Sequence, residues 1–150
     1  MRQFPEVSEL IPHRPPFLWV DRIVAWEGQS IITEKFVPMD LDILTGHYPN
    51  MPILPGVLLC EAVFQSGALL IALSHRTSDS LGATVPVLTR ISAARFKRSA
   101  YPGDTLRVSV RQTEALANVA FFKGNVTVAG KSALQVEFAC ARVTADQAAG

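Results

Sequence analysis

The chain has 150 residues, the length of one domain with one buried core, so we expect residues 1–150 to form a single domain. Its formal net charge of +1 argues against nucleic acid or an anionic membrane surface as the main partner. Hydrophobic residues make up 49% of the chain, which favours a large buried surface, including a subunit interface or an apolar ligand tunnel.

The N-terminal residues 1–6 lack the apolar segment of a signal peptide. The longest apolar run, Val57–Leu73, is interrupted by Glu61, so no membrane span is expected. Two cysteines, Cys60 and Cys140, are too few for a disulfide framework. We therefore expect a cytoplasmic protein with reduced core thiols.

Alternating and apolar runs predict six strands and one long helix. The strands are residues 17–24, 30–37, 86–98, 105–111, 119–128 and 131–143, with tight connections at 27–29 and 129–130. A loop rich in Pro and Asp, residues 38–55, is long for a compact domain, and loops of that length are usually functional. The helix runs from Val57 to about His75 and is apolar almost all round, which is typical of a buried helix. Polar loop is predicted for residues 76–84 and a loose tail for 145–150.

The order of these elements predicts the fold class. The strands that follow the helix are joined by tight turns, so the sheet is predicted to be antiparallel. One long apolar helix needs one sheet to wrap it. The sequence therefore predicts an α+β fold in which a curved antiparallel sheet wraps around one central helix.

One histidine and one carboxylate stand on either side of the predicted helix start. His47 lies in the long loop between a glycine and a Tyr-Pro pair, and Glu61 lies one turn into the helix. A buried carboxylate is usually neutralised, paired or put to use. The backbone N–H groups of Gly56 and Val57 open the helix, with the positive end of its dipole. This arrangement favours His47 and Glu61 as a catalytic proton-transfer pair, and the alternative for Glu61 is a structural ion pair with an arginine.

Other side chains are candidates for supporting roles. Gln65 lies one turn after Glu61 and either packs in the helix or bonds a site group. His13, in a Pro-rich segment, and His75, at the helix end, are predicted to be structural. No metal is expected, because two cysteines and three histidines show no ligand spacing. A basic strand edge is either a solvated face or a docking surface for an acidic partner protein, and it consists of Arg90, Arg95, Lys97 and Arg98.

Short segments along the chain carry a further signal. They are Pro12-His13-Arg14, Gly46-His47-Tyr48-Pro49, Pro55-Gly56-Val57-Leu58, Glu61-Ala62, Gln65, Ala94-Arg95-Phe96-Lys97-Arg98 and Pro102-Gly103-Asp104. Each segment alone is weak, but their order and spacing are specific and cover most of the chain. Together they resemble the 3-hydroxyacyl-acyl-carrier-protein dehydratases of bacterial type II fatty acid synthesis, the FabZ-like hotdog family. The resemblance implies the hotdog fold.

The resemblance also implies dehydration of (3R)-hydroxyacyl-acyl carrier protein thioesters to trans-2-enoyl thioesters, in fatty acid or related acyl or polyene synthesis. His47 would take the α-proton as the base. The N–H groups of Gly56 or Val57 would hold the thioester oxygen, and Glu61, kept protonated by burial, would donate to the departing hydroxyl. No cofactor is implied beyond the phosphopantetheine of the carrier protein. The family completes each His–Glu site across a homodimer, so a dimer or a trimer of dimers is expected.

Departures from the family pattern leave the acyl length and the pathway open. Tyr48 stands where the family usually has phenylalanine, and Phe64 stands one turn beyond Glu61 where a small residue is usual. Phe64 either narrows the acyl tunnel or packs in the core. Two other functions stay open: a hotdog acyl-thioesterase, which typically lacks the histidine, and a non-catalytic acyl-carrier-binding subunit, which would have lost the histidine or the glutamate.

Overall fold

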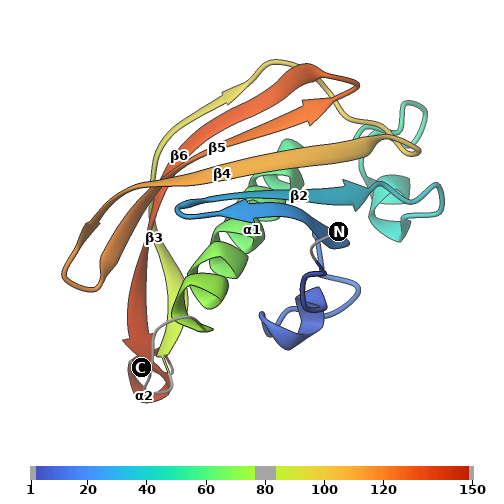
Figure 1. Ribbon diagram of the computed structural model, residues 1–150. Helices are drawn as coiled ribbons and strands as arrows, with labels where there is room; N and C mark the ends of the chain where they lie inside the picture. Colours follow the sequence, from blue (N-terminus) through green and yellow to red (C-terminus); the bar gives the residue numbers. More distant parts are fainter. Residues whose placement is uncertain (1–2, 77–83, 149–150) are drawn as a thin grey trace.

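The computed structural model describes residues 3–76 and 84–148. In this part of the chain one long helix, α1 (Gly56–Arg76), lies against the inner face of one curved six-stranded sheet (Figure 1). The sheet order is β1-β2-β4-β5-β6-β3, and every neighbouring pair is antiparallel. The predicted α+β class and hotdog fold are confirmed. The strands are β1 (Arg22–Glu27), β2 (Ser30–Phe36), β3 (Thr84–Phe96), β4 (Thr105–Leu116), β5 (Val119–Val128) and β6 (Lys131–Thr144).

Period-two burial on the strands builds the core. In β4, Leu106, Val108 and Val110 are buried while the residues between them are exposed. Alternate side chains of a strand point to opposite faces, so one face of the sheet covers α1 and the other faces outward. One buried polar contact joins the two layers, because the hydroxyl groups of Thr33 on β2 and Ser66 on α1 lie 2.7 Å apart.

Two glycines let the helix and the sheet approach closely. A Cβ atom at Gly124 in β5 would overlap Cγ1 of Val63 on α1. On the helix side, a Cβ atom at Gly67 would lie 2.9 Å from the ring of Phe138, which also stacks on Phe122 with the ring centroids 5.0 Å apart. The missing side chains therefore set how close α1 comes to the sheet.

Two strand predictions are wrong in part. The first strand begins at Arg22 rather than at residue 17, because the main chain of Phe17 and Trp19 bonds to the side chain of Gln65 on α1 instead of to a strand. The expectation that tight turns join all strands after the helix fails at β3. β3 pairs with β6, and the next strand along the chain, β4, is not a neighbour of β3 in the sheet.

Short elements fill the connections. The long loop contains a 3-10 helix, η2 (Asp42–Gly46), and another, η1 (Val7–Glu9), lies near the N-terminus. The tail predicted for 145–150 is wrong for its first four residues, which form α2 (Ala145–Ala148). The peptide N–H of Gln147 donates to Oγ1 of Thr144, and the peptide N–H of Thr144 donates to Oε1 of Gln147, which stabilises the start of α2. Most of the predicted polar loop, residues 77–83, lies outside the described residues.

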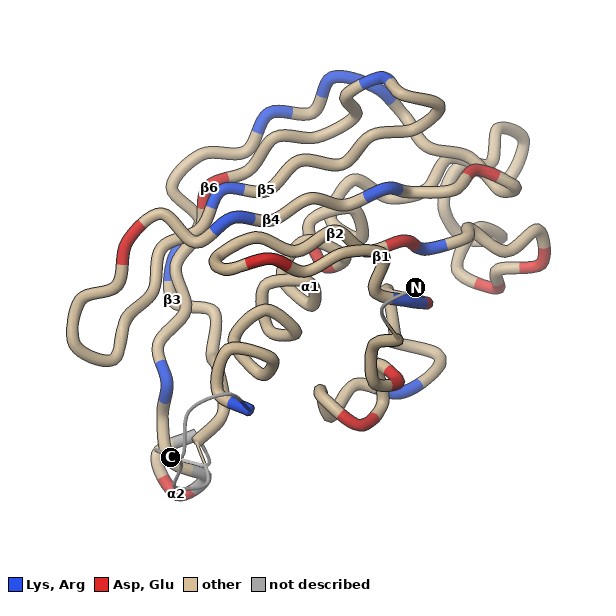
Figure 2. The backbone as a smooth tube through the Cα atoms, in the orientation of Figure 1, with Lys and Arg blue, Asp and Glu red and all other residues tan. Residues whose placement is uncertain are grey.

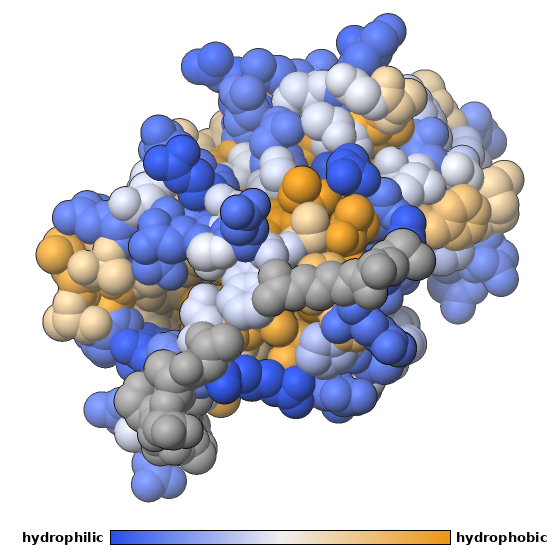
Figure 3. Space-filling view, viewed as in Figure 1, coloured by the Kyte–Doolittle hydropathy of each residue, from blue (hydrophilic) through white to orange (hydrophobic). Residues whose placement is uncertain are grey.

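Helix α1 is slightly longer than expected, since it begins at Gly56 and ends at Arg76. Its 21 residues suffice by length and composition to cross a membrane, although the sequence suggested that Glu61 interrupts the run. More than half of its most apolar part is buried against the rest of the fold, and the core helix of a soluble protein passes the same test. Figure 3 shows that exposed apolar side chains lie among the hydrophilic ones on this face of the molecule.

We expect Gly124→Ala to lower the free energy of unfolding by about 1–3 kcal/mol, because the new methyl group overlaps Val63 in a packed core. Urea denaturation followed by circular dichroism measures this. The double variant Val63→Ala, Gly124→Ala is the control, since it removes the overlapping methyl group and should be more stable than the sum of the single effects predicts. Strict additivity would contradict the close approach of the two elements.

Candidate active site

His47 has its ring orientation and its tautomer fixed by the loop that carries it. The residue follows η2, and its Nδ1 lies 2.9 Å from the carbonyl oxygen of Ile53. A carbonyl oxygen only accepts hydrogen bonds, so Nδ1 carries the proton and Nε2 presents a lone pair. The ring of Tyr48 packs edge-on against the imidazole, with the centroids 4.7 Å apart. This geometry leaves Nε2 of His47 available for the predicted role of a base.

A cavity of about 480 Å³ joins His47 to the start of α1. Gly56 lines this cavity, and the ring of Phe96 lies so close to it that a Cβ atom there would come within 2.8 Å. Leu54 anchors the approach to the helix, because its N–H donates to the carbonyl oxygen of Ala100 at 2.8 Å. Among the described contacts no hydrogen bond occupies the N–H groups of Gly56 and Val57. Two free donors at a helix N-terminus suit a developing negative charge.

Glu61 lies on α1, and one of its oxygens is held by protein groups. Its side chain is 22% exposed. Its Oε1 accepts a hydrogen bond of 3.0 Å from Nε2 of Gln65 and faces Nε2 of His13 at 3.8 Å. No contact involving Oε2 is recorded for the described residues. The carboxyl therefore has one fixed oxygen and one oxygen available for chemistry.

Gln65 is a buried clamp between α1 and the segment that precedes β1. Its Oε1 accepts from the N–H of Trp19 at 2.8 Å, and its Nε2 donates to the carbonyl oxygen of Phe17 at 2.9 Å. These main-chain partners fix which end of the amide is the nitrogen. Gln65 must therefore donate, not accept, at Glu61. The sequence left two roles open for Gln65, packing within the helix or bonding a group of the site. The structure shows a hydrogen bond from Gln65 to the predicted acid, Glu61.

His47 and Glu61 do not meet within one described chain. The cavity that His47 lines contains no atom of Glu61, and no hydrogen bond or ion pair of the described residues joins the two side chains. Their joint action as a catalytic pair stays a prediction. Glu61 also has no arginine partner among the described ion pairs, so the structural Arg–Glu alternative receives no support from this chain.

The remaining predicted residues divide between two places. Lys97 and Arg98 line the His47 cavity, whereas Arg95 lies on the outer face of the sheet and Arg90 stands further back along β3. Figure 2 shows the basic residues along this strand and the turn after it.

Phe64 is half-buried, and its ring meets that of Phe138 edge-on with the centroids 5.0 Å apart. Sequence reasoning missed the contact of His13 with Glu61 and expected only a structural role. The available signal was its place in the Pro12-His13-Arg14 segment.

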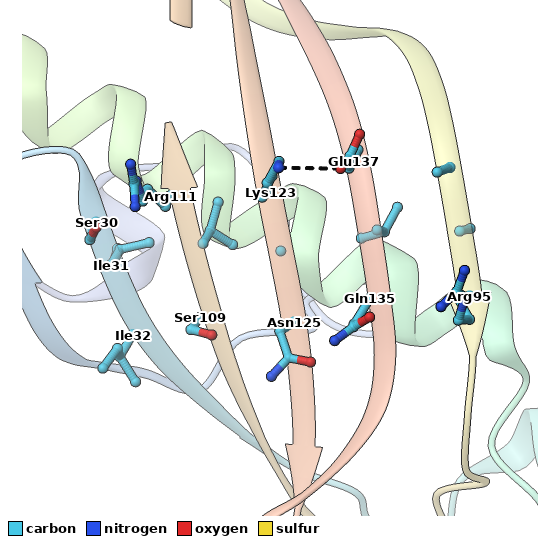
Figure 4. A pocket seen from close by; sticks show the side chains of 15 residues that line it. Ser30, Ile31, Ile32, Arg95, Ser109, Arg111, Lys123, Asn125, Gln135 and Glu137 are labelled. Carbon is cyan, nitrogen blue, oxygen red and sulfur yellow. Dashed lines mark ion pairs between the residues drawn. The ribbon is translucent and has the colours of Figure 1, made fainter. Parts of the chain in front are cut away.

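A larger hollow lies elsewhere in the described part of the chain. It has a volume of about 730 Å³ and follows the outer face of the sheet, with α1 behind the strands (Figure 4). Ser109, Asn125 and Gln135 line it, beside the Lys123–Glu137 ion pair with an N–O distance of 3.5 Å. None of the predicted catalytic residues reaches it. The smaller cavity is the candidate active site, because His47 and the start of α1 both line it.

The two cysteines are not suited to nucleophilic chemistry. Burial raises the pKa of Cys140 to about 11. Burial also raises the pKa of Cys60, and the neighbouring Glu61 carboxylate adds to the rise. Both thiols are free and buried, as predicted. Across the described ranges, no group of three or more His, Cys, Asp or Glu side chains is arranged to hold a metal ion.

Comparisons with known proteins agree with the motifs. The family model of the FabA-like domain matches residues 11–137. The chain is 39% identical to proteins named 3-hydroxyacyl-[acyl-carrier-protein] dehydratase FabZ from Actinobacillus succinogenes and from Mannheimia succiniciproducens, over 91% of this chain and 90% of each relative. The dehydratase heterocomplex ApeI:P from Xenorhabdus doucetiae has a chain of the same fold, with a TM-score of 0.83 at 14% identity, covering 98% of this chain and 97% of that chain. The family match spans both His47 and Glu61.

We expect Gln65→Leu to destabilise the fold, because the buried N–H of Trp19 and the carbonyl of Phe17 lose their partner. The expected loss in the free energy of unfolding is about 1–3 kcal/mol for each group left unpaired. Urea denaturation measures it. Gln135→Leu is a matched control, since Gln135 is an exposed amide on the outer face, and its stability should stay close to that of the parent. Equal stability of the two variants would contradict the clamp.

Proposed function

The chain belongs to the FabA-like domain family, and from this membership we propose that it dehydrates (3R)-hydroxyacyl thioesters of an acyl carrier protein to trans-2-enoyl thioesters. The reaction serves fatty acid synthesis or a related acyl or polyene pathway. The observation that supports the proposal is that His47, with Nε2 available as a base, lines the same cavity as Gly56 at the start of α1. The phosphopantetheine thioester of the carrier is the only prosthetic group that the reaction uses.

The chemistry follows from these groups. His47 takes the α-proton at Nε2, and electrons move toward the thioester oxygen. The N–H groups of Gly56 and Val57 stabilise the negative charge on that oxygen. Glu61 gives the proton on Oε2 to the 3-hydroxyl group, which leaves as water while the double bond forms. Tyr48 and Gln65 act in support, because each packs on or bonds to one member of the pair.

Two chains complete each site in this proposal. Strand β3 lies at one edge of the sheet and is exposed along nearly its whole length. It exposes five large apolar side chains, Val85, Val87, Leu88, Ile91 and Phe96. A long apolar edge strand is a template for pairing with another chain. On α1, Val57 is 71% exposed, and Glu61 and Phe64 follow at helical spacing on the same half-buried stripe. A second copy across the β3 edge would cover this stripe and bring its own His47 to Glu61.

The carrier protein docks beside the cavity in this proposal. Lys97 and Arg98 line the cavity that holds His47, so an acidic partner bound there can deliver its thioester to the base. Arg90 and Arg95 are exposed on β3, and we infer that their positive charge steers the encounter. We infer that residues 1–150 act as one cytoplasmic catalytic domain, assembled as a homodimer or as a trimer of dimers.

We expect His47→Ala to lower the rate of double-bond formation by at least about 10²–10⁴-fold, because the base is lost. Glu61→Gln should also lose most of its activity while the fold stays at least as stable as the parent, since the amide has nearly the same shape. The assay follows the enoyl product from 3-hydroxyacyl carrier thioesters of several lengths, and denaturation checks the fold. Near-parental turnover by purified His47→Ala protein would overturn the proposal.

Mixing the two inactive variants tests the shared site. In a mixed dimer, one site receives the intact His47 of one chain and the intact Glu61 of the other. With random pairing, co-refolded variants should recover about a quarter of the parental activity, because half of the dimers contain one intact site of two. No recovery, with dimers confirmed by light scattering, would place each pair within a single chain.

Phe64→Ala separates the two roles considered for this ring. The ring packs against Phe138 and also lies one turn from Glu61 on the half-buried stripe. As a tunnel residue, its removal should shift the preferred acyl chain to longer lengths with a modest loss of stability. As a core residue, its removal should cost about 3–5 kcal/mol and leave the length profile unchanged. We expect the first result, because the ring is only partly buried in a single chain.

A further inference from the structure

His13 lies beside the predicted acid on a segment that is tied down independently. The guanidinium group of Arg14 donates to the carbonyl oxygens of Ile11, His13 and Ser8 at 2.7–2.8 Å. A few residues on, the main chain of Phe17 and Trp19 is clamped by Gln65. These bonds hold the backbone on both sides of His13, so its ring is positioned over α1 by main-chain contacts that do not involve the imidazole itself.

The imidazole faces the same carboxyl oxygen that Gln65 holds. Nε2 of His13 lies 3.8 Å from Oε1 of Glu61, and Nε2 of Gln65 lies 3.0 Å from the same atom. The first distance is longer than a hydrogen bond, but catalytic hydrogen bonds in unliganded structures are often long and tighten in the complex. Among the described residues, both contacts of this carboxyl are made to Oε1.

The other ring nitrogen shows which form of His13 fits. Nδ1 is buried and has no hydrogen-bond partner among the described residues. A protonated imidazole would carry N–H groups at both nitrogens and would bury one unpaired donor. The neutral ring with its N–H at Nε2 leaves an unpaired acceptor at Nδ1 instead, but it buries no charge and points a donor at Oε1. A neutral donor suits a protonated acid, whereas a positive charge in the same place would favour the ionised carboxylate.

Resting on the proposed dehydration, we propose that His13 is a positioning residue for Glu61. As a neutral donor it acts with Gln65 to hold Oε1 as the accepting oxygen of the carboxyl. The proton of the acid then stays on Oε2, and the 3-hydroxyl group of the substrate receives it from there. His13 touches no reacting atom and acts only through Glu61.

Three substitutions at His13 test this role. His13→Asn keeps a neutral donor and should retain most of the activity. His13→Ala removes the donor and should lower kcat by about tenfold or more with little change in KM, because the acid loses its orientation. His13→Lys introduces a fixed positive charge and should move the alkaline limb of the kcat/KM profile to lower pH by about one unit or more. A purely structural residue would lose activity in proportion to stability and leave the profile in place.

A control and a second measurement make the result decisive. His75→Asn makes the same change at a histidine on the other end of α1 and should leave the profile unchanged. In protein labelled with ¹³C at glutamate carboxyl groups, the Glu61 signal, assigned with Glu61→Gln, should titrate at lower pH in His13→Lys than in the parent. This shift does not need turnover, so a protein that fails to dehydrate still tests the contact. An unshifted Glu61 titration in folded His13→Lys protein would overturn the proposal.

Discussion

One constraint shapes this molecule: helix α1 is apolar on nearly every side, and a single sheet covers only part of it. The sheet curves around the helix, and Gly124 and Gly67 omit side chains where the two layers touch. The stripe left over carries Val57, Glu61 and Phe64, and the strand at the near edge of the sheet, β3, is exposed and apolar. The predicted acid therefore lies on the part of α1 that the sheet leaves uncovered. Because a second chain would cover the same part, we expect assembly and catalysis to depend on each other.

The polar groups inside this apolar frame are few, and each fixes a position. Gln65 is 1% exposed, and its amide joins two main-chain groups of the segment before β1 to the carboxyl of Glu61. A buried amide with all its partners in place specifies one arrangement, because any other leaves a buried group unpaired. The same bonds that keep residues 17–21 out of the first strand thus hold the carboxyl of Glu61. Residues 17–21 do not belong to a strand, and the main chain of this segment instead holds the side chain of Gln65 in place.

Patterns of apolar residues were enough to predict α1, its burial and the antiparallel sheet, because period and length distinguish a buried helix from half-buried strands. The neighbours of β3 were not predictable, since its own residues show that it is a strand but not that it pairs with β6. His47 and Glu61 stood out by residue type and spacing. The contact of His13 with Glu61 did not, because it joins segments 48 residues apart (61 − 13) through the course of an irregular segment. The tautomer of His47 likewise depends on a carbonyl group that only the folded loop supplies.

The two halves of the proposed site are held by separate means before they meet. The loop fixes His47 through the carbonyl oxygen of Ile53, and the helix fixes Glu61 through Gln65. Neither half relies on the other for its geometry, so joining them across a dimer requires only that two rigid surfaces dock. Catalytic groups that need no reorganisation stabilise a transition state at the lowest cost. A site divided in this way also gives an isolated chain no complete active centre, and activity then follows the amount of dimer rather than the amount of folded chain.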